Sequence, residues 1–290
     1  MCAFQEHNPI AVAVYLLGVS GVAMFCPDPA ILVISLTGAV MLFLHLNGTK
    51  GGRSHLYTLG LFLLMAAVNP LVSHRGRTVL FVLNDNPVTL EAVLYGLAAA
   101  GMVVAVMYWF RCFTCIMTSE RLLYLFGALS PGLSLLLSMA LRYVPLFGQQ
   151  LRRTQQTQQA MGLYREDTLT GRVRGRLQVF SVMVTWALEN GVITADSMAA
   201  RGYGCGRRTH FRAFRFTWRD GLLTALSLLL TAVAFLAASR RQFTFYPALS
   251  ADPLTPLVLT GYAAYALLAL LPLIINGKEA LRWRCLQSNR

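Results

Sequence analysis

The stretch VTLEAVLYGLAAAGMVVAVMYWF, residues Val88–Phe110, contains a single charged side chain, Glu91, close to its start. An α-helix needs roughly 20 apolar residues to cross the hydrocarbon core of a bilayer, and this stretch supplies them. Five further apolar runs occur along the chain, at Ile10–Phe25, Ala30–Leu46, Leu56–Val72, Leu222–Ala238 and Leu254–Ile275. The sequence therefore predicts an all-α integral membrane protein with about six transmembrane helices.

Composition supports this fold class. Of the 290 residues, 56% are hydrophobic and 13% are charged, about half the charged fraction of a soluble domain. The net charge is +13, and 23 of the 25 basic residues are arginine. Membrane proteins collect arginine in cytoplasmic loops and at helix ends that meet lipid phosphate. We therefore expect contact with membrane lipid and no binding of nucleic acid.

The chain shows no catalytic or metal-binding pattern. Cys112 and Cys115 form one C-x-x-C, without a second pair or a nearby histidine, so neither a metal site nor a disulfide framework is expected. Neither lysine, Lys50 or Lys278, lies in a P-loop, and the H-E-x-x-H and G-x-S-x-G motifs are absent. We expect a non-enzymatic protein without a cofactor. Any ATP hydrolysis coupled to its function must come from another chain.

One long segment is strongly basic. Between Arg142 and Arg219 there are thirteen arginines and four acidic residues, a net charge of +9, which places the segment on the cytoplasmic side of the membrane. The last two apolar runs then cross the membrane outward and back again. The tail with Lys278, Arg282 and Arg284 is therefore also cytoplasmic. The expected organisation is transmembrane helices in 1–120, a kinked helix with a basic cytoplasmic region in 121–219, and two transmembrane helices with a basic tail in 220–290.

The apolar run Leu122–Leu141 leaves two topologies open. Ser130-Pro131-Gly132 interrupts the run, which favours a kinked, partly embedded helix over a plain crossing. If it does not cross, Lys50, Arg53, Arg111 and Arg121 lie inside, with only Arg75 and Arg77 outside. If it crosses, these counts reverse. The first arrangement, with a cytoplasmic N-terminus, follows the positive-inside rule better.

Two helices of the basic segment are predicted to share one kind of ending. The first continues through Gln149–Gln159 and ends at Ala160-Met161-Gly162, where glycine suits the left-handed position that closes a helix. The second runs from about Leu177 to Ala200-Arg201-Gly202, with a kink or break expected at Asn190-Gly191. Arg201 lies where the helix dipole favours a cation. The alternative interpretation of both endings is ordinary capping without a further role.

The second helix is also amphipathic. Its polar side chains fall on one stripe and its apolar side chains on the opposite face, so we expect it to lie along an apolar surface with a polar edge exposed. The polar stripe is Gln178, Ser181, Thr185, Glu189 and Asp196, and the apolar face is Leu177, Phe180, Val184, Ala187 and Leu188.

The order of several motifs resembles that of the transmembrane (T) component of energy-coupling factor transporters, the vitamin and metal importers of prokaryotes. The most specific motif is ADSMAARGYG at 195–204, followed by GRRT at 206–209. The others, in chain order, are Asn8-Pro9, Asn69-Pro70-Leu71, Arg75-Gly76, Thr89-Leu90-Glu91, Leu141-Arg142-Tyr143-Val144-Pro145 and Leu188-Glu189-Asn190.

This resemblance implies a multi-pass protein of a prokaryotic cell membrane that joins two cytoplasmic ATP-binding-cassette ATPases to one substrate-binding membrane (S) component. In that family, two coupling helices cross near the membrane surface, and each ends in an Ala-Arg-Gly-like motif seated in a groove of one ATPase. Ala200, Arg201 and Gly202 match this motif. Ala160, Met161 and Gly162 match it except for Met161, and Arg165 is a candidate source of the missing charge. Supporting positions of the coupling helices are Arg142, Pro145, Glu189, Asp196 and Arg165.

Two other functions compete with this interpretation. A self-sufficient secondary transporter needs intramembrane polar groups or broken helices in two matching halves, and the predicted crossings are almost uncharged. A membrane-embedded enzyme needs a catalytic constellation, which the sequence does not offer. Dependence of uptake on a cytoplasmic ATPase distinguishes the coupling subunit from the secondary transporter.

Overall fold

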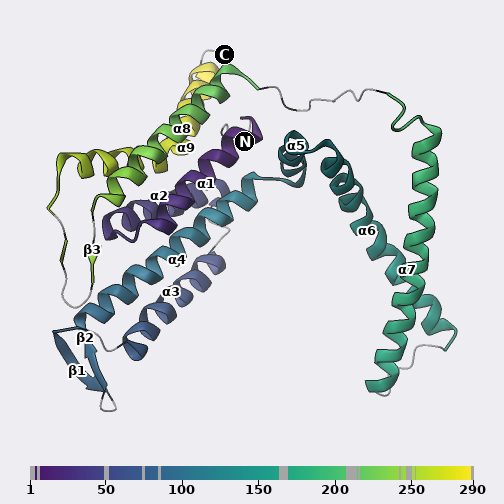
Figure 1. Ribbon diagram of the computed structural model, residues 1–290, viewed down its shortest axis with the longest axis horizontal. Helices are drawn as coiled ribbons and strands as arrows, with labels where there is room; N and C mark the ends of the chain where they lie inside the picture. Colours follow the sequence, from purple (N-terminus) through teal and green to yellow (C-terminus); the bar gives the residue numbers. More distant parts are fainter. Residues whose placement is uncertain are drawn as a thin grey trace. The chain divides into compact units, whose positions relative to one another are not determined.

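In the computed structural model the described residues are 4, 7–48, 52–73, 76–83, 86–162, 169–206, 214, 216–241, 243–245, 250–251 and 253–288. They form two compact units (Figure 1). The first unit combines Met1–Leu122 with Phe214–Arg290, and the second is Leu123–Ala213.

The first unit contains the long apolar helices and two short antiparallel hairpins, β1–β2 between α3 and α4, and β3–β4 between α8 and α9. Its helices are α1 (Pro9–Phe25), α2 (Pro29–Asn47), α3 (Gly52–Val72), α4 (Leu90–Ile116), α8 (Trp218–Ser239) and α9 (Pro256–Ser288). Its strands are β1 (Val79–Leu83), β2 (Asn86–Thr89), β3 (Phe243–Thr244) and β4 (Ser250–Ala251).

Helices α2, α3, α4, α8 and α9 are long and apolar enough to span a bilayer, and α1 is a shorter apolar helix of 17 residues. These six helices correspond to the six runs predicted from the sequence. The prediction of an all-α, multi-pass membrane protein is confirmed.

Hydrogen bonds between helices satisfy the polar groups inside the first unit. The Tyr15 hydroxyl of α1 donates to the Leu268 carbonyl at 3.1 Å, and the Tyr265 hydroxyl of α9 donates to the Val19 carbonyl at 3.2 Å. The Trp109 indole of α4 donates to the Ser35 hydroxyl of α2 at 2.9 Å. Lipid tails offer no partners for such groups, so these bonds fix which helix faces meet. Helix α3 lies along the outer side of α4 (Figure 1).

A tight connection joins α1 to α2. Asn8 and Asp28 cap α1 and α2, each accepting a hydrogen bond from the backbone N–H two residues on, at 3.0 Å and 3.2 Å. A proline occupies the first position of each helix, where its fixed φ and missing N–H are tolerated. The connection Cys26-Pro27-Asp28 therefore reverses the chain within a few residues.

The run Leu122–Leu141 forms two helices, where one kinked helix was expected. Helix α5 (Ser119–Leu129) ends before Ser130, and α6 (Pro131–Ala160) begins with proline, which cannot continue the α5 hydrogen-bond ladder. With 11 residues, α5 is only about 16 Å long, too short to cross. Four apolar helices, α1 to α4, therefore precede the basic segment along the chain.

Glu91 has a structural position at the start of α4. Its side chain is 3% exposed, and its carboxylate accepts hydrogen bonds from the Thr78 hydroxyl at 2.8 Å and the Thr78 N–H at 3.3 Å. Gly76 leaves the room this requires, because a Cβ there would lie 2.6 Å from the Glu91 carboxylate. The acid closes the loop before α4 and explains why the motifs around Gly76 and Glu91 occur together.

Close packing of α8 and α9 depends on small side chains. A Cβ added at Gly261 of α9 would lie 2.2 Å from the Ala237 Cβ of α8, whereas one added at Gly277 would meet no atom within 4 Å. We expect Gly261→Leu to destabilise the full chain in detergent by about 1–3 kcal/mol. Gly277→Leu, on the same helix, should leave the thermal unfolding temperature nearly unchanged. Equal unfolding temperatures for the two variants would show that α8 and α9 do not pack as described.

Candidate partner-coupling site

The second unit is built on α6 and α7 (Leu169–Ala200), which pack against each other in antiparallel directions. Tyr143 of α6 shares a hydrogen bond of 2.7 Å with Thr194 of α7. One helical turn further along α6, the Phe147 ring meets the Trp186 ring edge-on, with centroids 5.4 Å apart. These contacts advance along α6 as they retreat along α7, which defines an antiparallel helix pair.

Further toward the end of α6, the same pairing continues with Gln155 and Arg176, which line one small cavity between the helices. The contact face of α7 includes Val179, which is 2% exposed, and that of α6 includes Thr154 and Gln158, both under 10% exposed. The contacts given by these residues extend from Tyr143 to Gln158 on α6 and from Arg176 to Thr194 on α7. The sequence predicted both helices but not this contact face.

Helix α7 starts eight residues before its predicted beginning at Leu177 and continues through Asn190-Gly191, where a kink or break was expected. The Asn190 side chain donates to the Trp186 carbonyl at 2.8 Å, and the Thr194 hydroxyl donates to the Asn190 carbonyl at 2.7 Å. Both bonds reach the carbonyl four residues earlier, so these polar side chains are satisfied within a continuous helix. The predicted break is wrong.

Helix α7 ends in a complete Schellman motif. The Gly202 N–H donates to the Ala199 carbonyl at 2.9 Å, and the Tyr203 N–H donates to the Met198 carbonyl at 3.0 Å. Gly202 has φ +78°, a conformation that side chains with a Cβ rarely adopt. Arg201 is the last residue before this reversal and is exposed. Its side chain extends from the helix end into open space.

Helix α6 ends in the same way, as far as the described residues extend. The Gly162 N–H donates to the Gln159 carbonyl at 3.0 Å, and Gly162 has φ +70°. Met161 occupies the position equivalent to Arg201 and is 61% exposed. No atom lies within 4 Å of a Cβ added at either glycine, so the backbone conformation, not crowding, favours glycine there. The predicted left-handed glycine is confirmed at Gly162, and Arg165 lies outside the described residues.

Antiparallel packing separates the two helix ends. Ala160 lies near the beginning of α7, while Ala200 lies at its end, so the rise of 1.5 Å per residue places them roughly 40 Å apart. Each ends in Ala-X-Gly with the middle side chain exposed. The α6–α7 pair can therefore present two similar contact sites, one at each end, at a fixed distance from each other.

The four other predicted positions that the structure describes lie along the α6–α7 pair. Arg142 is exposed with its guanidinium 5.6 Å from the centre of the Tyr143 ring, and Pro145 is exposed within α6. Glu189 and Asp196 are exposed on α7. Among the described residues, no ion pair joins Arg142 to Glu189 or Asp196. Their charges therefore face outward.

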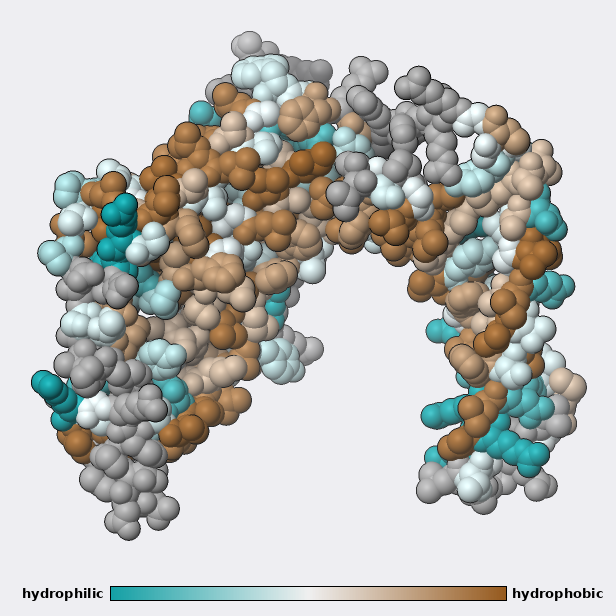
Figure 2. Space-filling view, viewed as in Figure 1, coloured by the Kyte–Doolittle hydropathy of each residue, from teal (hydrophilic) through white to brown (hydrophobic). Residues whose placement is uncertain are grey.

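An exposed apolar stripe runs along α7, and one of its members, Phe180, also borders the cavity between α6 and α7. Leu177, Phe180 and Leu188 are 62–68% exposed, and Val173 and Val184 continue the stripe at helical spacing. Figure 2 shows hydrophobic and strongly hydrophilic side chains alternating over α6 and α7. Both the apolar face and the polar stripe predicted for α7 are thus exposed, because α6 covers a third face.

Two contacts in the first unit secure the chain where it enters and leaves the second. The Arg121 guanidinium lies 5.9 Å from the centre of the Phe214 ring, and burial lowers the pKa of Arg121. Asp220 is 3% exposed and accepts hydrogen bonds from Thr217, from the Asn8 N–H at 3.2 Å and from His7 at 2.8 Å. These contacts were not predicted from the sequence, although T-x-x-D at 217–220 is the pattern of a capping box, which Thr217 and Asp220 form.

Cys112 and Cys115 do not lie together in one metal or redox site. Cys112 is fully buried and its thiol contacts the Ala39 carbonyl at 3.8 Å, while Cys115 is exposed. Among the described residues, no cluster of three or more histidine, cysteine or acidic side chains could hold a metal ion.

Comparison with known proteins gives one partial match. Over 119 residues, 39% of this chain, the sequence is 29% identical to the energy-coupling factor transporter transmembrane protein EcfT of Brevibacillus brevis. The match spans 45% of that relative's length. No protein-family model matches the chain. The match confirms the resemblance to T components over that part, and it agrees with a multi-pass protein of the cell membrane.

The two glycine positions of α7 provide a matched test of the helix ending. Gly202 has positive φ, whereas Gly191 is helical with no atom within 4 Å of an added Cβ. Gly202→Ala should destabilise the ending by about 1–2 kcal/mol and speed hydrogen exchange at the amides of 202 and 203. Gly191→Ala should stabilise α7 by up to about 1 kcal/mol. Exchange that is slower in Gly202→Ala than in the parent would contradict the Schellman ending.

Proposed function

We propose that this chain is the T component of an energy-coupling factor importer, a non-catalytic scaffold that transmits ATP-driven motion from two cytoplasmic ATPases to a substrate-binding membrane subunit. The observation that carries the proposal is the pair of equivalent helix ends, Ala160–Gly162 and Ala200–Gly202, on one antiparallel helix pair. The similarity to an energy-coupling factor transporter transmembrane protein supports it. The transported substrate is a vitamin or a metal ion, selected by the separate substrate-binding subunit.

Each helix end is suited to contact one ATPase. A side chain at the last position of a helix projects beyond the final turn, and the small neighbours Ala200 and Gly202 allow a groove to approach closely. Arg201 can form charge-assisted hydrogen bonds with an acidic groove, each contributing about 1.5–3 kcal/mol. Met161 offers only packing and adaptability. The two ATPase contacts are therefore unequal in strength.

The exposed stripe of α7 is suited to the membrane subunit. Leu177, Phe180 and Leu188 present an apolar surface that water disfavours and that an apolar partner surface can cover. We assign this stripe to the substrate-binding subunit because the two helix ends are assigned to the ATPases. In this arrangement a movement of either ATPase reaches the membrane subunit through α6 and α7.

The membrane-embedded acids argue against a self-sufficient secondary transporter. Glu91 closes the loop before α4, and Asp220 joins α8 to the N-terminus, so both are engaged in hydrogen bonds within the chain. ATP is bound by the partner subunits in this proposal. Uptake of a labelled vitamin into liposomes by the pure chain, without any ATPase, would favour the alternative.

The strength of the two helix ends can be compared directly. Arg201→Glu places a negative charge against an acidic groove and should abolish ATPase copurification and transport while the chain stays in the membrane. Arg201→Ala should weaken copurification more than Met161→Ala does. Met161→Arg should be tolerated or increase it. Membrane abundance of all four variants is the control for misfolding, and unchanged copurification of Arg201→Glu would reduce Arg201 to a helix cap.

The sidedness of the membrane is the second test of the proposal. In a chain whose native cysteines are replaced, single cysteines at positions 172 and 288 should react with an impermeant thiol reagent only after the membrane is opened. A cysteine at position 250, in the hairpin between α8 and α9, should react in intact cells and serves as the matched control. Labelling of position 172 in intact cells would place the coupling helices outside and exclude contact with cytoplasmic ATPases.

A further inference from the structure

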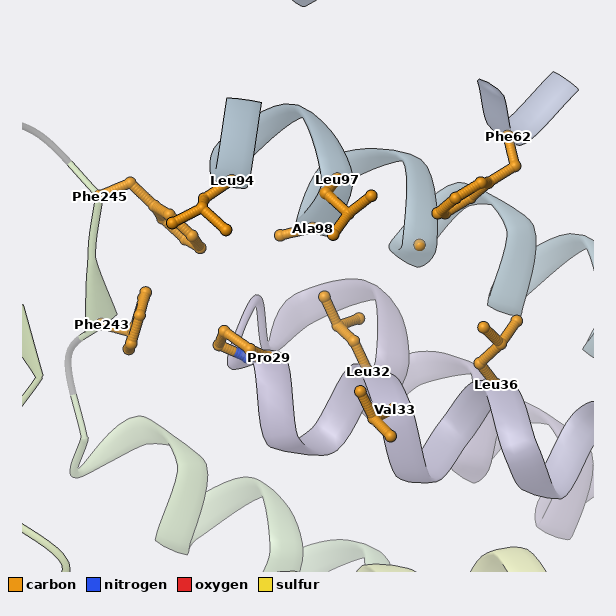
Figure 3. A pocket seen from close by; sticks show the side chains of 11 residues that line it. Pro29, Leu32, Val33, Leu36, Phe62, Leu94, Leu97, Ala98, Phe243 and Phe245 are labelled. Carbon is orange, nitrogen blue, oxygen red and sulfur yellow. The ribbon is translucent and has the colours of Figure 1, made fainter. Parts of the chain in front are cut away.

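Helices α2 and α3 are consecutive in the chain, yet each packs against α4 and they leave a cleft between them. One end of the cleft holds a cavity of about 260 Å³ between Leu32 and Leu36 of α2 and Leu94 and Gly101 of α4. Figure 3 shows the side chains that line it, with Phe243 and Phe245 at one end and Phe62 at the other. All of its lining residues are apolar.

A second cavity of about 510 Å³ continues the cleft toward the other membrane surface. It shares Leu36 and Phe62 with the first cavity and extends to His55, Thr58 and Tyr108. The cleft thus runs from an apolar end beside β3 to an end that carries polar side chains, along the candidate membrane spans of α2, α3 and α4.

The polar end has the chemistry of an anion site. His55 Nδ1 shares a hydrogen bond of 2.7 Å with the Tyr108 hydroxyl, and His55 Nε2 is buried without a partner among the described residues. If Tyr108 donates to Nδ1, the neutral ring carries its hydrogen on Nε2 and offers a donor. Arg111 brings a positive charge to the same place: it donates to the Thr58 hydroxyl at 2.8 Å and lies over the Phe43 and Tyr108 rings.

The depth of this end in the membrane matches a lipid headgroup. Arg111 lies 21 residues after Leu90, the first residue of α4, which corresponds to about 32 Å along the helix. The hydrocarbon core is about 30 Å thick, so the guanidinium reaches the level of the lipid phosphates. The proposed topology makes this the cytoplasmic surface, where anionic lipids attract arginine.

We propose that this cleft binds one anionic phospholipid, with its phosphate at His55 and Arg111 and an acyl chain lying between α2, α3 and α4. The dimensions favour an acyl chain over a helix of a partner protein. A helix about 10 Å across fills on the order of 120 Å³ per residue, so the two cavities, of about 260 and 510 Å³, would accept only about six residues, less than two helical turns. The bound lipid occupies the space between α2 and α3, where these two helices do not pack against each other.

Gly101 allows the cleft to be filled without disturbing the protein. It lines the first cavity, and a Cβ added there meets no atom within 4 Å. Gly101→Phe should therefore occupy the place of the acyl chain. Gly21→Phe on α1, where an added Cβ also meets nothing within 4 Å, is the matched control outside the cleft.

The test is native mass spectrometry of the full-length chain, released from micelles that contain equal amounts of phosphatidylglycerol and phosphatidylcholine. We expect the parent and Gly21→Phe to retain one phosphatidylglycerol in preference to phosphatidylcholine. Gly101→Phe should lose the bound lipid. Arg111→Gln should reduce the preference for phosphatidylglycerol about fivefold, the effect of one arginine near an anionic surface. Thermal unfolding of each variant excludes general misfolding.

Three results would overturn the proposal. The first is that the parent retains both lipids equally. The second is that Gly101→Phe retains as much phosphatidylglycerol as Gly21→Phe. Either of these results would indicate only unspecific lipid at the protein surface. In the assembled membrane complex, a cysteine at position 101 could crosslink to another protein, which would show that a partner fills the cleft.

Discussion

The antiparallel contact between α6 and α7 is the constraint on which the proposed coupling depends. The Tyr143–Thr194 hydrogen bond and the Phe147–Trp186 ring contact fix the register of the two helices. That register alone places the two Ala-X-Gly ends at opposite tips, roughly 40 Å apart. A parallel pair, or two independent helices, would bring the same sequence motifs together or leave their separation undefined. Two contacts held at a fixed distance can respond to a relative movement of two ATPases.

Contacts within the first unit anchor the chain at the two points where it passes into and out of the second unit. Arg121 packs on Phe214, and Asp220 ties the start of α8 to His7 and Asn8. A further bond, from the Phe4 N–H to the Asn276 side chain at 3.0 Å, joins the N-terminal segment to α9. Because these hydrogen bonds are buried or partly buried, breaking one of them lowers the stability of the fold more than breaking an exposed hydrogen bond does. Several motifs of the resemblance, including Asn8-Pro9 and Thr89-Leu90-Glu91, thus have local structural roles.

Apolar runs, proline positions and glycine endings allowed much of this fold to be predicted. The six apolar helices follow from run length, and the endings at Gly162 and Gly202 follow from glycine's tolerance of positive φ. Asn190-Gly191 misled the prediction, because the packing of Trp186 and Thr194 on α6, on both sides of the pair, outweighs its low helix propensity. The contact face of α6 on α7 and the cleft beside α3 depend on which helices pack together. Periodicity in a single sequence does not contain that information.

The central claim is that both tips of the α6–α7 pair contact ATPase subunits at the same time. Photoreactive amino acids incorporated at positions 161 and 201, one at a time, would test it in native membranes. We expect both positions to crosslink to ATPase chains, and a chain carrying both labels to capture two ATPase copies. Crosslinks from position 201 only to lipid or to the membrane subunit, with none to an ATPase, would contradict it.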